Sequence, residues 1–122
     1  MRPSFSSQKP LFLSIAEWLE GAILAGIFSE ESQVPSITEI SVEYNINPAT
    51  ALKGVNILVE SGLLYKKRGL GMFVATGARV RLMEIRQQRF FEDFIRPLVL
   101  EARRLEISET AINDMIERGF NE

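Results

Sequence analysis

The stretch that decides the fold is VPSITEISVEYNINPATALKGVNILVESGLLYKKRGLGMFV, residues 34–74. It contains two helix-start signals, at Ser36 and at Asn47-Pro48, because Ser and Asn cap helix N-termini and Pro suits the first helical position. Gly62 ends the second helix, and two strand-like runs joined by a glycine-containing turn follow it. This order predicts a winged helix-turn-helix, which offers DNA a helix for the major groove and a basic loop for the flanking backbone.

Local signals refine the two helices. Ser36 and Glu39 have the spacing of a capping box, in which each side chain bonds the backbone N–H of the other residue, and this predicts a short helix over residues 37–44. Ile46 lies in the following turn and is expected to fill the space between the helices. Gly54 lies inside the second helix, where it costs roughly 1 kcal/mol relative to Ala. A close approach of another helix would explain it.

Upstream, apolar residues recur every four positions, at Leu11, Ile15, Leu19, Ile23 and Ile27. This spacing places them on one face of a helix and predicts a core helix over residues 10–25. The polar residues before it are expected to form a loose arm. We therefore expect a DNA-binding domain over residues 1–76.

Composition narrows the function classes. The chain has 122 residues, of which 46% are hydrophobic, enough for one domain or one small domain with an appendage. It has no cysteine and no histidine, so thiol chemistry is excluded and the commonest general base and metal ligand are absent. We expect no enzyme, no cofactor and no metal site. No apolar run approaches the roughly 18 residues that span a bilayer, and no signal sequence is recognisable, so we expect a cytoplasmic protein with no membrane partner.

Charge argues mildly against a nucleic-acid binder, because the net charge is −2 and such domains are usually basic. The densest basic run is Lys66-Lys67-Arg68, at the tip of the expected hairpin. On its own such a run is typical of a solvated turn. Its place directly after a helix-turn-helix favours contact with DNA.

The stretch resembles the GntR family of bacterial transcription regulators. Family members carry a Leu-Pro-Ser-x-Arg-x-Leu-Ala segment, a Thr-Val pair in the recognition helix and a Gly-x-Gly-x-Phe-Val wing. The chain has the corresponding segments Val34-Pro35-Ser36-Ile37-Thr38-Glu39-Ile40-Ser41, Thr50-Ala51 and Gly69-Leu70-Gly71-Met72-Phe73-Val74. The resemblance covers about the first 75 residues and implies a regulator whose partner is double-stranded DNA.

The departures from the family pattern affect base recognition. Thr38, Pro48 and Leu52 stand where family members commonly have basic residues, and an Arg paired with guanine can supply about 1–3 kcal/mol of discrimination. For Asn47, helix capping competes with DNA contact for the same side-chain oxygen. The residues that we expect at the DNA are Ser36, Thr38, Asn47, Thr50, Lys53, Lys66, Lys67, Arg68, Gly69 and Gly71.

Residues 77–122 predict a helical dimerisation tail of two helices, the long one kinked at Pro97. This tail is too short to enclose a metabolite pocket of ordinary size, and no effector site is recognisable. Three phenylalanines within five residues need a partner surface, either a second subunit or the domain itself. The short tail is similar to the YtrA-like subfamily of GntR regulators, which implies a small homodimer, often controlling a transporter operon. The expected dimer contacts are Phe90, Phe91, Phe94 and Leu98.

The fold class that we predict is therefore mainly α with a small β-hairpin: a winged helix-turn-helix followed by a two-helix dimerisation segment. The function that we predict is a sequence-specific DNA-binding transcription regulator, a homodimer on a two-fold operator. An alternative is a degenerate winged-helix module that binds proteins and little or no DNA, for which the residues at positions 38, 48 and 52 are the evidence. A small enzyme is disfavoured because no motif pairs carboxylates or a Lys for catalysis.

Overall fold

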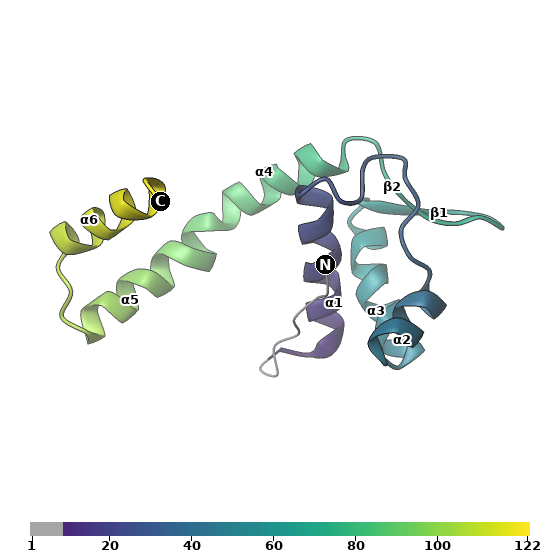
Figure 1. Ribbon diagram of the computed structural model, residues 1–122, viewed down its shortest axis with the longest axis horizontal. Coiled ribbons are helices and arrows are strands. Elements are labelled where there is room, and N and C mark those ends of the chain that lie inside the picture. The colour runs from purple at the N-terminus through teal and green to yellow at the C-terminus, as the bar shows by residue number, and fades with distance from the viewer. Residues whose placement is uncertain (1–8) are drawn as a thin grey trace. The chain divides into compact units, whose positions relative to one another are not determined.

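Residues 9–122 are described by the computed structural model, and they fall into two units. One unit ends at Glu84 and the other runs from Ile85 to Glu122, so the division lies within a helix. The boundary expected from the sequence, between residues 76 and 77, lies just before that helix. The elements along the described chain are α1 (Leu11–Leu24), α2 (Ile37–Tyr44), α3 (Pro48–Glu60), β1 (Leu64–Lys67), β2 (Gly71–Val74), α4 (Ala78–Phe90), the π-helical turn η1 (Phe91–Ile95), α5 (Arg96–Arg104) and α6 (Glu109–Phe120) (Figure 1).

The core of the first unit lies where α1 packs on α3. Gly54 permits this packing, because a Cβ built there would lie 2.8 Å from the Phe12 carbonyl oxygen and 2.9 Å from the Cβ of Ile15. The close helix approach expected at Gly54 is therefore confirmed. The largest fully buried side chains are Ile15, Leu19, Ile23, Ile40, Leu58, Leu63, Leu64, Leu82, Val55 and Val74.

The short helix α2 begins and ends as the sequence predicts. The Ser36 hydroxyl oxygen accepts from the Glu39 N–H at 3.0 Å, and the Glu39 carboxylate accepts from the Ser36 N–H at 3.0 Å. Asn45 ends the helix in the left-handed conformation, with φ of 54°, which Asn tolerates better than most residues. Ile46 is buried in the turn that follows. These contacts fix the angle at which α3 leaves α2.

A third extended segment pairs with the hairpin, which the sequence did not reveal. β1 and β2 pair antiparallel, with Leu64 opposite Val74 and Lys67 opposite Gly71. The segment before α2 then lies along the other side of β2: the Val34 N–H donates to Met72 at 2.9 Å, and the Val74 N–H donates to Ser32 at 3.0 Å. This pairing ties the wing to the start of α2.

The helices of the second unit follow the expected pattern with one difference. The sequence predicts a kink at Pro97, and the structure places a π-helical turn directly before it, where the Arg96 N–H donates to the Phe91 carbonyl. A wider turn accommodates a residue that has no N–H and whose ring crowds the preceding turn. Ser108 caps α6 as predicted, its hydroxyl oxygen accepting from the Ala111 N–H at 3.1 Å.

The predicted fold class is confirmed: helices dominate, and one hairpin follows the helix-turn-helix. Within residues 9–122, the structure contains no helix with both the length and the apolar character needed to cross a bilayer.

Candidate nucleic-acid interface

One face of α3 is free of the core and is available to a ligand. The buried residues of the helix are Ala51, Gly54, Val55 and Leu58, which recur at helical spacing toward α1 and α2. On the other side, the exposed residues between positions 49 and 56 are Ala49, Leu52, Lys53 and Asn56. This face has the length and position of a recognition helix.

Asn47 caps the N-terminus of α3. Its Oδ1 accepts from the Ala49 N–H at 2.8 Å, and Pro48 occupies the first turn, where its missing N–H leaves no unmet donor. The sequence left open whether this oxygen caps the helix or contacts DNA, and in the structure it caps the helix. Any contact of Asn47 with DNA would have to come from its Nδ2 donor.

Lys53 is the one cation on this face of α3, and its position is set by an aromatic ring. Its Nζ lies 4.0 Å from the centroid of the Phe12 ring on α1. A ring below an ammonium group holds it by cation–π attraction while leaving its other side open to an anion. Thr50, one turn earlier, is half-buried. Lys53 is therefore preorganised at the edge of the face that α3 presents.

The N-terminus of α2 presents Ser36 and Thr38. Ser36 is half-buried and already engaged on both its N–H and its hydroxyl oxygen, whereas Thr38 is exposed. The bonds from Ser36, the backbone one foremost, hold the pKa of the Glu39 carboxyl below its ordinary value. A carboxylate is thus fixed at this helix start, where the helix dipole favours it and where it would repel a phosphate. Thr38 is the more accessible of the two expected contacts.

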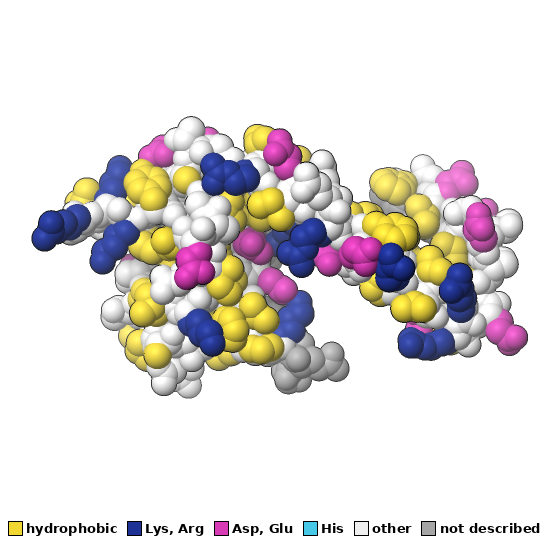
Figure 2. Space-filling view, turned by 180° about the vertical axis from the view of Figure 1, so that it is seen from behind, with side chains coloured by type: hydrophobic (Ala, Val, Ile, Leu, Met, Phe, Trp, Pro, Cys, Tyr) yellow, Lys and Arg dark blue, Asp and Glu magenta, His cyan; other side chains and the backbone are white. Residues whose placement is uncertain are grey.

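The three basic residues of the wing do not form one patch. Strand side chains alternate between faces, so Lys66 and Lys67 point to opposite sides of the hairpin. Lys66 and Arg68 are exposed, whereas Lys67 is half-buried with its Nζ 4.4 Å from the centre of the Phe73 ring. Figure 2 shows basic side chains at the free end of the hairpin, on the left of the view. Lys66 and Arg68 are the wing cations open to a phosphate backbone.

The tip of the wing is held by a side chain from before α2. The Leu70 N–H donates to the Lys67 carbonyl at 2.9 Å across a turn in which Gly69 has φ of 79°. The Leu70 carbonyl accepts from the Gln33 Nε2 at 2.7 Å. Gly71 has φ of 122°, and a Cβ there would lie 2.6 Å from the same Nε2. Gly71 therefore has a folding role, in addition to the DNA contact expected from the sequence.

One face of the wing carries a hydrogen-bonded carboxylate. Glu31 accepts hydrogen bonds from the hydroxyls of Tyr65 and Thr76, the latter at 2.6 Å. These bonds, the one from Thr76 first, lower the pKa of Glu31, and the same carboxylate raises the pKa of Tyr65. Glu31 also lies in the left-handed conformation, with φ of 63°. This face of the hairpin is organised by internal contacts and by a negative charge, so a phosphate would be disfavoured there.

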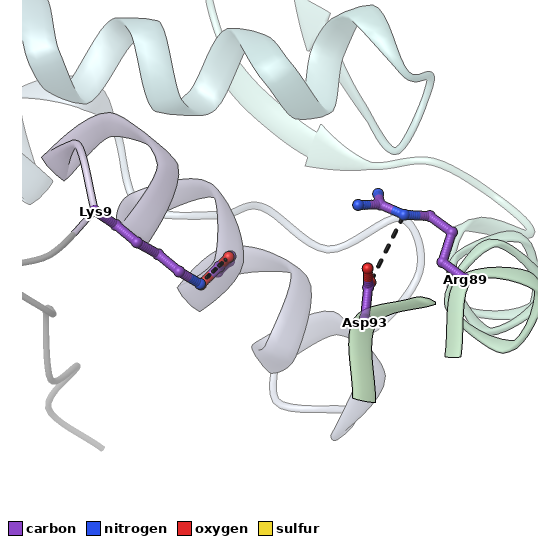
Figure 3. Close-up of polar contacts among 4 residues, drawn as sticks. Lys9, Arg89 and Asp93 are labelled. Carbon is purple, nitrogen blue, oxygen red and sulfur yellow. Dashed lines mark hydrogen bonds and ion pairs between the residues drawn. The ribbon is translucent and has the colours of Figure 1, made fainter. Parts of the chain in front are cut away.

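Several cations outside the helix-turn-helix are used within the fold. Arg79 Nε donates to the Leu24 carbonyl at 2.9 Å, and Arg81 donates to the Gly62 carbonyl at 2.8 Å, so both bond the ends of helices. Figure 3 shows two ion pairs, one between Arg89 and Asp93 at 3.7 Å and one that joins Lys9 to a carboxylate of α1 at 2.7 Å. Because these arginines and Lys9 are bonded within the fold, they are less available to a phosphate backbone than Lys66 and Arg68.

Comparison with known proteins shows which regulators the chain is similar to. No protein-family model matches the chain. The HTH-type regulator YurK of Bacillus subtilis is 31% identical over 68 residues, 56% of this chain and 28% of that protein. A solved GntR-family structure from Bacteroides thetaiotaomicron superposes with a TM-score of 0.69 at 29% identity, covering 90% of this chain and 96% of the other. The chain is similar to GntR-family regulators over most of its length.

Other relatives match the chain over different lengths. The repressor YtrA of Bacillus subtilis is 22% identical over 91% of this chain and 85% of its own length. A GntR regulator from Listeria monocytogenes has the same fold, with a TM-score of 0.76 over 93% of this chain and 98% of that chain. The chain spans about a quarter of the length of YurK. These relatives are transcriptional regulators, not enzymes.

The similar solved structures include complexes with operator DNA. The DNA-binding domain of AraR, crystallised with operator ORE1, superposes on 62% of this chain and 94% of that domain, with a TM-score of 0.53 at 26% identity. In the present structure, the expected DNA-binding residues cluster at three places: the start of α2, the exposed side of α3, and the wing. Gln33 and Glu31 were missed by sequence reasoning, because their partners lie more than 30 residues away in the chain.

Proposed function

We propose that this GntR regulator binds a two-fold operator as a homodimer, with one α3 in the major groove of each half-site. The observation that carries the proposal is the exposed side of α3 with Lys53 at its edge and two open wing cations beside the same helix-turn-helix. The groups that would contact DNA are Thr38, Asn47 through Nδ2, Thr50 and Lys53, with Ser36, Lys66, Lys67, Arg68, Gly69 and Gly71 completing the surface.

The C-terminal unit supports the homodimer. Phe90, Phe91 and Phe94 are 52%, 54% and 62% exposed, and Leu98 is half-buried. The rings of Phe90 and Phe94 lie 5.2 Å apart, so they form one apolar surface. Burying a Phe side chain is worth roughly 1.5–3 kcal/mol, and a symmetric interface buries each of them twice, which can exceed the cost of association. A dimer would also raise affinity for paired half-sites through effective concentration.

By resemblance to the YtrA-like subfamily, the regulated genes would include a transporter operon. The similarity to YtrA extends over most of both chains, which supports the short-tailed arrangement.

The DNA-binding part of the proposal is tested on the wing. Replacing Lys66, Lys67 and Arg68 together by Ala should weaken binding to all duplexes and flatten its salt dependence, by about 0.9 in the log–log slope for each phosphate that is no longer neutralised. Of the single variants, Lys66→Ala and Arg68→Ala should have the larger effects, because Lys67 is held against Phe73. Unchanged affinity of the triple variant at two salt concentrations would contradict the proposal.

The dimer is tested separately. Replacing Phe90, Phe91 and Phe94 by Ser should give a monomer in sedimentation whose winged helix-turn-helix stays folded. Val42→Ser, at an exposed apolar position of α2, is the matched control and should leave the dimer intact. Wild type that sediments as a monomer at micromolar concentration, or a triple variant that still protects both half-sites in footprinting, would refute the dimer.

A further inference from the structure

The exposed side of α3 carries an apolar residue where a base reader is expected. Leu52 is 46% exposed. Its exposed neighbours on the helix are small or polar: Ala49, Lys53 and Asn56. A protein partner typically covers about 800 Å² on each side, and one leucine among polar residues does not make such a surface. The position of Leu52 suits a polar, negatively charged ligand that presents one small apolar group.

Only one base presents such a group in the major groove. Thymine carries a 5-methyl group, whereas guanine presents the O6 and N7 acceptors and cytosine an amino donor. A leucine placed against guanine or cytosine would remove these polar groups from water without replacing their hydrogen bonds, which is unfavourable. Leu52 in the groove therefore selects for thymine and against G·C pairs.

Asn56 lies four residues after Leu52, one turn along the same face and about 6 Å further along the helix axis. An Asn side chain can bond both N6 and N7 of adenine. The exposed side of α3 contains no Arg, the residue that most often reads guanine, and its Lys53 is held over Phe12.

We propose that α3 reads A·T pairs, with Leu52 in contact with a thymine methyl group and Asn56 bonded to an adenine nearby. This inference rests on the proposed function and specifies its base preference. Lys53 then contributes affinity through the phosphate backbone, and the wing cations do the same.

The test alters the DNA first and the protein second. Duplexes are selected from a random pool with the full chain, and each thymine of the selected site is then replaced by uracil, which removes only the methyl group. Wild type should bind the uracil duplex about fourfold more weakly at one or two positions of each half-site, the equivalent of burying one methyl group. Because the protein is unchanged in this comparison, its folding does not affect the result.

The protein variant assigns the effect to Leu52. Leu52→Ala should bind thymine and uracil duplexes equally, while Ile27→Ala, at an exposed apolar position after α1, should keep the wild-type difference. Equal binding of both duplexes by wild type, or a difference that persists in Leu52→Ala, would overturn the inference while leaving DNA binding intact. If wild type selects no duplex at all, the proposed function fails and the inference fails with it.

Discussion

Two helical glycines in this protein should respond in opposite directions to the same substitution. Gly21 lies in α1 and Gly54 in α3, and neither has a positive φ. A Cβ at Gly21 meets nothing within 4 Å, whereas one at Gly54 meets the Phe12 carbonyl oxygen at 2.8 Å and the Cβ and Cγ2 of Ile15 at 2.9 Å. We therefore expect Gly21→Ala to stabilise the fold and Gly54→Ala to destabilise it.

The magnitudes follow from two opposing effects. Replacing Gly by Ala inside a helix stabilises by about 0.5–1 kcal/mol, because the unfolded chain loses conformational freedom. At Gly54, an extra methyl group in a packed core costs about 1–3 kcal/mol. The upper part of that range applies, because the atoms it meets are a backbone oxygen and a β-branched side chain, neither of which can move aside cheaply. The gain in helix stability is common to both variants, so they should differ by the packing cost at Gly54, about 2–3 kcal/mol in the free energy of unfolding.

Urea unfolding of the two variants and of wild type measures this difference, with equal slopes required for the comparison. DNA affinity provides a second measurement: Gly54→Ala moves α3 away from α1 and should weaken binding, while Gly21→Ala should not. If Gly54→Ala were as stable as Gly21→Ala, the close contact between α1 and α3 would not constrain the fold, and the explanation given for this glycine would be wrong.

Three further predictions concern the wing and the start of α3. Gln33→Ala removes the bond to the Leu70 carbonyl, so it should weaken DNA binding without lowering the melting temperature of the helical core. Hydrogen exchange at the wing tip should become faster, and unaltered exchange would contradict this prediction. The pKa of Glu31 is lowered in the folded state, so its bonds with Tyr65 and Thr76 stabilise the fold above the ordinary pKa of a Glu and are lost as the pH falls through the folded pKa. The difference in melting temperature between wild type and Glu31→Gln should therefore shrink from about pH 7 to about pH 3. A difference that stays constant over this range would refute the role of Glu31. Asn47→Asp keeps the capping oxygen but replaces the Nδ2 donor by negative charge, so stability should be kept and DNA affinity should fall, whereas equal affinity would exclude Asn47 from the interface.

The elements of the helix-turn-helix were predictable because their signals are local. The caps at Ser36, Asn47 and Ser108 each join residues two or three positions apart, so the spacing along the chain is enough to recognise them. The close helix approach at Gly54 was also inferred correctly, since a glycine inside a helix is costly without a packing reason.

The arrangement of the interface depends on contacts that no local pattern records. Gln33 bonds Leu70 across 37 residues of chain, and Lys53 is placed by the ring of Phe12 on another helix. The run Lys66-Lys67-Arg68 looks uniform as a sequence, yet strand alternation and the Phe73 ring divide its charges between two faces. Helix caps and periodicity are set by neighbours along the chain, whereas the direction of each cation is set by whichever distant side chain the packed core brings beside it.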